Sequence, residues 1–408
     1  MPAHDSSFHR IVLAYSGGLD TSAAIPYLRE TYACDVVAFV GDVGQGEEEL
    51  AGVEDRARAS GACDCVVIDL REDLLDCFAF PALLAGPIYE SKYLLGTAIA
   101  RPLLAKAQVQ VARDMGADAL AHGCTGKGND QVRFESAFAA LAPDLRVLAP
   151  WRLWSMRSRS DLVAYLRKHN ITTSAATTKT YSRDASLLHI SHEGGGVESP
   201  ANIPPDDVWM RTRNVDEAPV QPATVRIGFT AGRPTSLDGE ALSPVALVER
   251  LNTVAGEHSV GRVDLVESRL VGMKSRGCYE APGCTALVEA LGALERLTLD
   301  RDALHEKQRC ALRFAELVYD GKWFTPLREA LSAFAENLAH RLTGEVTVRL
   351  HKGVASAVAA TSSFSVHDAA LATFENDDIY DQKHAEGFIR LHSLPQRVEA
   401  LRRSKERV

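Results

Sequence analysis

Apolar runs and helical stretches alternate over the first 170 residues of the chain. Each apolar run has the length of a buried strand, and the runs lie at 11–15, 35–41, 63–70, 118–122 and 145–149. Stretches with helical spacing of their apolar residues follow these runs, at 20–30, 47–60, 72–84, 91–115, 131–141 and 159–169. Strands that alternate with helices are typical of a parallel, doubly wound sheet. We therefore predict an α/β fold for this part of the chain.

The pattern changes after residue 170. Residues 171–222 are rich in Thr, Ser, Pro and Gly and have little periodicity, so we expect long loops at a domain junction. An α+β pattern follows, with hairpins predicted around 225–234 and 346–360, a strand at 263–271 and helices at 244–256, 285–297 and 301–319. A length of 408 residues fits two or three domains.

The chain ends in a charged segment, 394–408, that is predicted to be a helix. Its apolar residues Leu394, Val398 and Leu401 are spaced to share one helical face. A short amphipathic tail of this kind is either solvated or docked on another subunit, and the pattern leaves both alternatives open.

The first predicted strand leads into the turn Ser16-Gly17-Gly18, and a helix is expected to begin at Asp20 or Thr21, either of which can cap it. Adjacent glycines let the backbone approach a ligand, and the unpaired first amides of a helix attract an anion. Hydroxyls and a carboxylate on Ser16, Asp20, Thr21 and Ser22 favour a phosphate site over a purely structural turn.

The same turn indicates which phosphate chemistry it serves. No lysine follows the glycines, so this is not the GxxxxGK[ST] loop that holds a γ-phosphate. The pattern SGGxDxS resembles the pyrophosphate loop of ATP-pyrophosphatases, which cleave ATP between its α and β phosphates.

A second glycine-rich turn, 123–130, follows the predicted strand at 118–122 and so lies on the same edge of the sheet. Within it and just after it, Thr125, Asn129, Asp130 and Arg133 supply a hydroxyl, an amide, a carboxylate and a guanidinium. An amino-acid substrate needs such partners for its ammonium and carboxylate groups. A surface ion pair between Arg133 and Glu135 is the alternative interpretation.

Charge and cysteine content limit the classes of function. The net charge is −9 and no cluster of Lys or Arg stands out, so neither nucleic-acid binding nor a polyanionic partner is expected. The eight cysteines form no CxxC motif and lie scattered among apolar residues, which favours reduced buried thiols over a metal site. No signal peptide or long apolar span is visible, so we expect a cytoplasmic protein without membrane association.

With both turns considered, the chain resembles the argininosuccinate synthase family. In the first half the resemblance rests on AYSGGLDTS, DVGQ, YLLGTAIARP, HGCTGKGNDQVRFE, APWR and HISHEGG, which begin at Ala14, Asp42, Tyr93, His122, Ala149 and His189. In the second half it rests on GRVDLVESRLVGMKSRGCYEAPG, RFAELVYDGKWFTP and YDQKHAEGFIRL, which begin at Gly261, Arg313 and Tyr380. The motifs are long and follow the family order over nearly the whole chain.

The resemblance implies that ATP drives the joining of citrulline to aspartate, with release of AMP and pyrophosphate. Mg²⁺ would accompany the ATP phosphates. The resemblance further implies an ATP-binding domain at 1–172, a synthetase domain at 173–365 and, at 366–408, a C-terminal arm of a homotetramer.

Each substrate is then expected at a set of residues that matches the family motifs. The implied ATP contacts are Ala14, Tyr15, Ser16, Gly17, Gly18, Leu19, Asp20, Thr21, Ser22, Gly41 and Gly123. The implied aspartate contacts are Thr125, Asn129 and Asp130. The implied citrulline contacts are Tyr93, Ala98, Asn129, Arg133, Ser182, Ser191, Glu267 and Tyr279. Asp20, Asn129 and Arg133 are the residues expected to act in catalysis.

The chain departs from the family pattern at a few positions. Cys124 stands where Ala is usual, Ala98 where Ser is common, and His192 where Tyr is usual. Ala98 can offer only a backbone contact to citrulline. Residues 285–298 lack a histidine pair that some members carry. These departures leave open a specialised paralogue with altered kinetics or substrate.

Two rival functions fit the sequence less well. Other ATP-pyrophosphatases that modify tRNA or work with a glutaminase need a catalytic cysteine pair, a basic extension or a further domain, and the sequence shows none of these. A nucleotide-binding protein without activity would tolerate loss of Asp20, Asp130 or Arg133, and all three are present.

Overall fold

The computed structural model describes residues 8–171, 181–373, 379 and 381–406. The predicted boundary between residues 172 and 173 lies outside these described residues. The chain divides into two compact units, 1–364 and 365–408.

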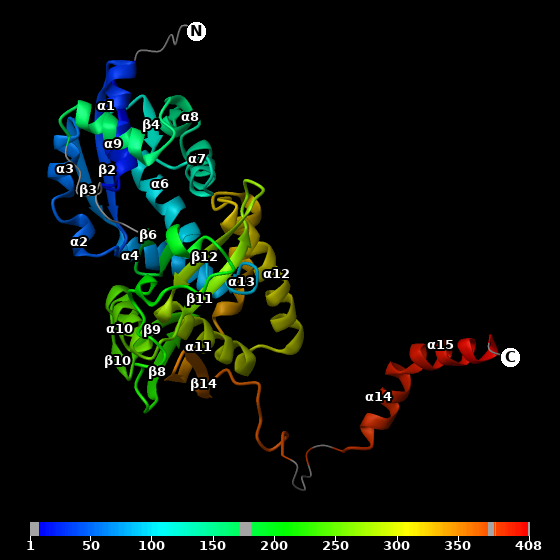
Figure 1. Cartoon of the computed structure of the whole chain (residues 1–408). Coiled ribbons are helices and arrows are strands. Elements are labelled where there is room, and N and C mark those ends of the chain that lie inside the picture. Colours follow the sequence, from blue (N-terminus) through cyan, green and yellow to red (C-terminus); the bar gives the residue numbers. More distant parts are fainter. Residues whose placement is uncertain (1–7, 172–180, 374–378, 380, 407–408) are drawn as a thin grey trace. The chain divides into compact units, whose positions relative to one another are not determined.

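A five-stranded parallel sheet with the strand order β3-β2-β1-β4-β5 organises the first half of the larger unit (Figure 1). Its strands are β1, Arg10–Ala14; β2, Asp35–Asp42; β3, Asp64–Asp69; β4, Ala119–His122; and β5, Arg146–Leu148. The order reverses at β1, as in a doubly wound fold, so the carboxyl ends of β1 and β4 lie side by side. The predicted parallel α/β sheet is confirmed.

Helices cover both faces of this sheet because its strands are apolar on both sides. Ile11 and Leu13 of β1 pack into one cluster with the helices α1 and α9, whereas Val12 packs on the other face with α6 and α7. The helices of this half are α1, Leu19–Tyr32; α2, Glu47–Leu50; α3, Val53–Ala59; α4, Arg71–Asp73; η1, Leu74–Ala79; α5, Phe80–Ala85; α6, Gly96–Asp114; α7, Asp130–Leu141; α8, Pro150–Leu153; and α9, Arg159–Lys168.

Several of the predicted helices are shorter or interrupted. The helix expected over 47–60 breaks at Gly52, whose φ of +65° is incompatible with a continuous helix. The helix expected from residue 91 begins only at Gly96, because Ser91 and Leu95 have positive φ angles of 63° and 64°. Local turn geometry thus overrides the helical spacing of the apolar residues at these positions.

The prediction of loops throughout 171–222 was wrong for residues 182–193. This segment forms β6, Ser182–Ala185, and β7, Ile190–Glu193, which join β11, Arg262–Ser268, and β12, Lys274–Glu280, in a four-stranded antiparallel sheet of order β11-β12-β7-β6. Neither short strand has enough residues for a period to show in the sequence. The two strands form because partners far along the chain supply their hydrogen bonds.

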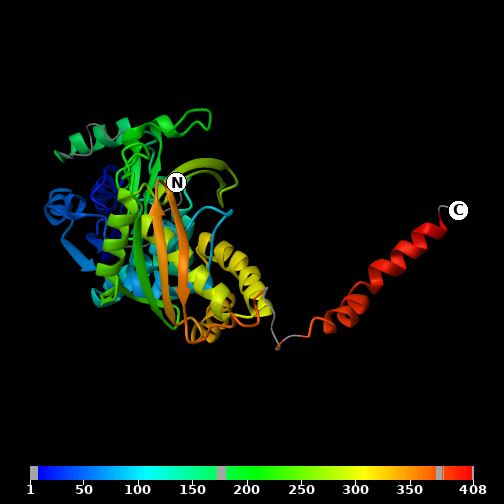
Figure 2. The same cartoon turned by 90° about the horizontal axis from the view of Figure 1, so that it is seen from below.

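A second antiparallel sheet has the order β10-β9-β8-β13-β14. Its strands are β8, Ala223–Thr230; β9, Arg233–Leu237; β10, Glu240–Ala241; β13, Gly344–His351; and β14, Val354–Thr361, and the two expected hairpins are confirmed. In Figure 2 the orange strands β13 and β14 lie side by side at one edge of this sheet. Helices α10, Pro244–Glu257, and α11, Pro282–Thr298, pack against it, and α12, Arg301–Tyr319, and α13, Pro326–Ala339, follow.

The smaller unit contains α14, His384–His392, and α15, Leu394–Lys405. Helix α15 confirms the predicted terminal helix, whereas α14 was not predicted. Leu394, Val398 and Leu401 are each about half exposed, at 48%, 58% and 55%. Among the described helices, none is long and apolar enough to cross a membrane.

Candidate functional site

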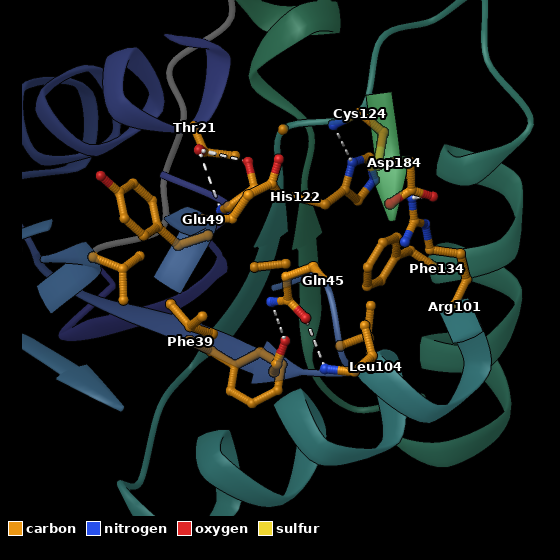
Figure 3. A pocket seen from close by; sticks show the side chains of 18 of the residues that line it. Thr21, Phe39, Gln45, Glu49, Arg101, Leu104, His122, Cys124, Phe134 and Asp184 are labelled. Carbon is orange, nitrogen blue, oxygen red and sulfur yellow. Dashed lines mark hydrogen bonds and ion pairs between the residues drawn. The ribbon is translucent and has the colours of Figure 1, made fainter. Parts of the chain in front are cut away.

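A cavity of about 240 Å³ opens at the carboxyl ends of β1, β2 and β4, where a doubly wound fold binds ligands (Figure 3). Phe39, Leu104 and Phe134 supply apolar walls. Polar groups line the rest, including Ser16, Asp20, Thr21, Gln45, Glu49, Arg101, His122 and Asp184. An apolar slot beside a polar end suits a nucleoside attached to phosphates.

The turn after β1 presents its backbone to this cavity. Helix α1 begins at Leu19 with Gly18 as N-cap, and no side-chain hydrogen bond among the described residues caps it. The prediction that Asp20 or Thr21 would cap the helix was therefore wrong, because the helix begins one or two residues earlier than expected and both residues lie inside its first turn. Gly17 has a φ of +72°, which a glycine adopts without strain. The uncapped first turn leaves helix amides for an anion.

Hydroxyl groups hold the turn in shape. The hydroxyl Oγ1 of Thr21 lies 3.3 Å from Oγ of Ser16 and donates to the carbonyl of Gly18 at 3.3 Å. Ser22 is buried and its Oγ lies 3.2 Å from the phenol oxygen of Tyr15. Asp20 lines the cavity, and burial raises its pKa although Arg159 opposes the shift.

The two glycine-rich turns touch each other. A Cβ atom on Gly123 would lie 2.7 Å from Cγ2 of Thr21, so only glycine allows this approach. Gly41 is enclosed in the same way, since a Cβ there would lie 2.4 Å from Cδ2 of Leu104. Ala14, Tyr15, Gly41 and Gly123 line the cavity together with Ser16, Asp20 and Thr21. Gly17, Gly18, Leu19 and Ser22 lie within the turn and the first turn of α1 without lining it.

A second cavity, of about 210 Å³, adjoins the first, and Cys124 and Asp184 line both. All of the predicted amino-acid contacts except Ala98 line it: Tyr93, Thr125, Asn129, Asp130, Arg133, Ser182, Ser191, Glu267 and Tyr279. Ala98 is fully buried in α6 and lines neither cavity. The residues come from the segment before α6, from α7 and the loop before it, and from the four-stranded sheet, so they meet only in the folded chain.

Asp130 stands at the centre of an ion-pair network that the sequence did not reveal. Its Oδ2 accepts from Nη2 of Arg101 at 2.9 Å, and its Oδ1 accepts from Nη1 of Arg133 at 3.0 Å. Nη2 of Arg101 also donates to Oδ2 of Asp184 at 2.7 Å. Burial acts to raise the pKa of Asp130, but the two guanidinium groups outweigh it and hold that pKa below its usual value. The network crosses from the second cavity to the first, because Arg101 lines the first.

Arg133 is buried, with a side-chain exposure of 5%. Besides Asp130, its Nε donates to the carbonyl of Tyr319 at 3.0 Å, and the guanidinium lies over the Tyr319 ring. Glu135 pairs instead with His122 at 2.9 Å and with Arg152 at 2.6 Å. The alternative of a surface pair between Arg133 and Glu135 was therefore wrong.

Asn129 is held at both ends of its amide. Its Nδ2 donates to the phenol oxygen of Tyr319 at 2.8 Å, and its Oδ1 accepts from the backbone N–H of Leu270 at 3.0 Å. The side chain therefore joins the start of α7 to α12 and to the turn between β11 and β12. One N–H and one lone pair remain for a ligand.

Aromatic rings and one carboxylate form the deep wall of the second cavity. Tyr93 stacks on Tyr279 with ring centroids 4.6 Å apart, and its phenol oxygen accepts from the backbone N–H of Thr97 at 3.2 Å. Glu267 is 4% exposed, and its Oε2 has no hydrogen-bond partner among the described residues. Burial raises its pKa although Tyr319 and Tyr279 donate to it. A buried acceptor without a partner is costly unless a ligand supplies the donor.

Sequence reasoning missed several residues of the site. Arg101 lies in the quoted YLLGTAIARP motif and was given no role, and Asp184 stands in the segment expected to be loop. Tyr319 lies in the quoted motif RFAELVYDGKWFTP and was also given no role, yet it contacts Asn129 and Arg133. The charge of Arg101 within a family motif would have pointed to a role in the site, whereas a tyrosine at the end of a predicted helix gives no such signal.

Metal-binding clusters are not found in the described part of the chain, where no group of three or more His, Cys, Asp or Glu side chains is placed to hold an ion. All eight cysteines lie among the described residues and are free thiols.

Comparisons with known proteins match nearly the whole chain. A family model for the arginosuccinate synthase N-terminal HUP domain matches residues 10–172, and one for the arginosuccinate synthase C-terminal domain matches residues 181–399. The argininosuccinate synthase of Shewanella baltica (strain OS155 / ATCC BAA-1091) is 56% identical over 393 residues, which cover 96% of this chain and 95% of that protein. The argininosuccinate synthase of Shewanella sp. (strain ANA-3) is also 56% identical over 393 residues, covering 96% of this chain and 97% of that protein.

Proposed function

Because the chain belongs to the argininosuccinate synthase family, we propose that its two adjoining cavities hold ATP and the two amino acids of that reaction. The chain is an ATP-dependent carbon–nitrogen ligase that condenses citrulline with aspartate through citrullyl-AMP and forms argininosuccinate, AMP and pyrophosphate. The residues that contact each substrate are inferred from the geometry of the two cavities.

ATP occupies the first cavity in this proposal. The adenine and ribose lie against Phe39, Leu104 and Phe134, and the departing pyrophosphate lies at the uncapped start of α1. Helix amides and the hydroxyls of Ser16 and Thr21 stabilise its charge. Asp20 and these hydroxyls are hard oxygen ligands, which fits a Mg²⁺ ion that arrives with the ATP phosphates and neutralises part of their charge.

Citrulline occupies the deep part of the second cavity. The orphaned oxygen of Glu267 supports this assignment, because the ammonium group of citrulline would supply its missing donor and the ureido end would then extend toward the first cavity. Arg133 pairs with the citrulline carboxylate, and Tyr93, Ser182, Ser191 and Tyr279 complete the contacts. Ala98 lies away from the cavity and makes no contact in this arrangement.

Aspartate binds beside citrulline, at the loop of Thr125, Asn129 and Asp130. Its ammonium group faces Asp130, whose Oδ1 has one lone pair left after the three hydrogen bonds that Arg101 and Arg133 donate to the carboxylate. Asn129 lies between the two amino acids, and its remaining N–H aligns the attack of the amine.

The order of the two steps follows from leaving-group chemistry. The amine of aspartate cannot expel oxide or hydroxide from a neutral ureido carbon at a useful rate. The ureido oxygen must therefore attack the α-phosphorus first, opposite the pyrophosphate, so that AMP becomes the leaving group. Residues of both cavities position these atoms, and orientation supplies a large part of the rate.

A labelling experiment tests this assignment of steps. Citrulline with ¹⁸O in its ureido group is expected to transfer one labelled atom per turnover to AMP, with AMP and pyrophosphate formed in equal amounts. Label in water or pyrophosphate, or ADP and phosphate as first products, would contradict the adenylate route for this protein.

We also propose the domain boundaries, the oligomeric state and the location of the protein. Residues 1–172 form the ATP-binding domain, 173–365 the synthetase domain and 366–408 an arm, and the separate compactness of 365–408 supports the last boundary. The exposed apolar residues of α15 support docking of the arm in a homotetramer. Eight free thiols support a reducing, cytoplasmic location.

A further inference from the structure

The second cavity has few cationic side chains to pair with the carboxylates of the two amino-acid substrates. Aspartate brings two carboxylates and one ammonium, and the loop of Thr125, Asn129 and Asp130 offers a partner of opposite charge only to the ammonium. Arg133 and Arg269 are the two cationic side chains among the described residues that line this cavity. Arg133 is taken by the citrulline carboxylate in the proposed arrangement, which leaves Arg269.

Arg269 is built into the site. Its side chain is 13% exposed, and its Nη2 pairs with Oε2 of Glu193 at 2.6 Å. Its Nε donates to the hydroxyl of Ser275, and its Nη1 lies 3.4 Å from the carbonyl oxygen of Lys127. A guanidinium has five N–H donors, so two remain without a partner among the described residues, and the long contact to Lys127 is weak and easily exchanged.

The position of Arg269 matches the position of the aspartate loop. Arg269 begins the turn between β11 and β12, and Lys127 belongs to the loop that also carries Thr125 and Asn129. The next residue, Leu270, donates its backbone N–H to Oδ1 of Asn129 at 3.0 Å. The β11–β12 turn therefore contacts the aspartate loop through two hydrogen bonds, which place the guanidinium of Arg269 beside that loop.

We propose that Arg269 binds the side-chain carboxylate of aspartate and so determines that aspartate, rather than a neutral amino acid, is the nucleophile; this rests on the proposed function. The ammonium and the α-carboxylate share one carbon atom and stay near Asp130 and the loop. The side-chain carboxylate reaches farther across the cavity, where Arg269 offers two N–H donors in a fork.

The test compares Arg269→Gln and Arg269→Lys with Lys274→Gln. Lys274 lies on the same hairpin and contacts Ser268 without lining the cavity, so its variant controls for disturbance of the hairpin. In Arg269→Gln the KM for aspartate is expected to rise about 10–100-fold, as for loss of a hydrogen bond to a charged group. The Lys variant is expected to lie between this value and the wild type, because it keeps the charge and loses the fork.

A half-reaction separates a substrate contact from a structural effect. Exchange of labelled pyrophosphate into ATP needs citrulline but not aspartate, and it is expected to stay within about twofold of the wild type in all three variants. The preference for aspartate over asparagine, measured as the ratio of kcat/KM values, is expected to fall in Arg269→Gln only.

Two outcomes overturn the proposal. One is an unchanged KM for aspartate in Arg269→Gln, and the other is parallel loss of exchange and of aspartate use in both Arg269 variants, which indicates structural support. Failure of the underlying assignment is distinguishable, because it would appear as wild-type enzyme without citrulline-dependent exchange.

Discussion

At the scale of single residues, the site depends on charges that are buried and paired. Asp130 illustrates this: it is half-buried and pairs with both Arg101 and Arg133 before any substrate binds. The sequence suggested a carboxylate with no nearby cation other than Arg133, because Arg101 lies 29 residues away. In the proposed arrangement Asp130 therefore serves two purposes: it supports the network, and it offers its remaining lone pair to the ammonium group of aspartate.

The substitution Asp130→Asn tests this double role. It keeps the shape but leaves two guanidinium groups short of a charge partner, and breaking a buried pair costs about 3–5 kcal/mol. We expect a lower unfolding temperature, and an aspartate affinity that falls far more than the ATP affinity in calorimetric titrations.

Asp144→Asn is the matched control for that variant. Asp144 pairs with Arg113 on the surface, with side-chain exposures of 59% and 43%, and solvent screening leaves such an exposed pair little effect on stability. Equal weakening of aspartate and ATP binding in Asp130→Asn would argue against the aspartate assignment.

At the scale of elements, the antiparallel strand β12 organises the segment that follows the short strands β6 and β7. Glu280, at its end, is fully buried and accepts from the backbone N–H groups of Met210, Arg211 and Thr212 at 2.8–2.9 Å. Nε2 of His192 lies 2.7 Å from Oε2 of the same carboxylate. His192 stands where the family usually has Tyr, so in this chain a histidine completes the anchor of this irregular segment.

We expect Glu280→Gln to lower the unfolding temperature strongly. An amide can accept fewer of these donors and turns its own N–H groups toward some of them, so the cost is about 3–5 kcal/mol, as for breaking a buried charged pair. Glu316→Gln is the control, since the one ion pair that Glu316 makes among the described residues is an exposed pair with Arg313 on α12. Calorimetric scans of both variants check the prediction, and equal effects would contradict it.

The same carboxylate gives a pH dependence of known sign. Burial acts to raise the pKa of Glu280, but the hydrogen bonds from His192, Met210 and Thr212 lower it below its ordinary value of 4.5. Its contribution to stability is therefore complete above pH 4.5 and is lost as the pH falls through the lower folded-state pKa. The difference in unfolding temperature between wild type and Glu280→Gln should shrink in acid, and a constant difference would contradict this.

At the scale of the whole molecule, the C-terminal unit carries apolar surface that its own fold does not cover. Phe388, Ile389 and Leu391 of α14 are 66%, 58% and 75% exposed. Leu394, Val398 and Leu401 of α15 are exposed as well. Helices as short as α14 and α15 are not stable alone in water. Burial on another subunit would supply the missing stability.

If the proposed homotetramer forms through the arm, deletion of residues 393–408 is expected to shift the protein to smaller species in light scattering, because the stripe of Leu394, Val398 and Leu401 is lost. Substitution of the exposed Arg403, which pairs only with Glu399 among the described residues, by Gln is the control and should leave the mass unchanged. An unchanged tetramer after the deletion would contradict the arm.

The local pattern alone determined the parallel sheet and the glycine turn that follows its first strand. Strands such as 35–41 are continuous apolar runs, and the turn Ser16-Gly17-Gly18 follows the first strand directly. Neighbouring residues are therefore enough to predict these features. The family motifs likewise identified, from the sequence, nine residues that line the second cavity. The motifs predict residues of the cavity because family members share the fold that brings these residues together.

Only the tertiary structure decided which charges meet. Arg101 and Asp184 come from separate elements, and Arg269 reaches the aspartate loop from a hairpin 142 residues farther along the chain. Strands β6 and β7 also form only because they pair with each other and β12 pairs with β7, and Ala98 lies fully buried in α6, away from both cavities. Sequence patterns report periodicity within one element, whereas burial and ion pairing depend on which elements pack together, and that is determined by the fold as a whole.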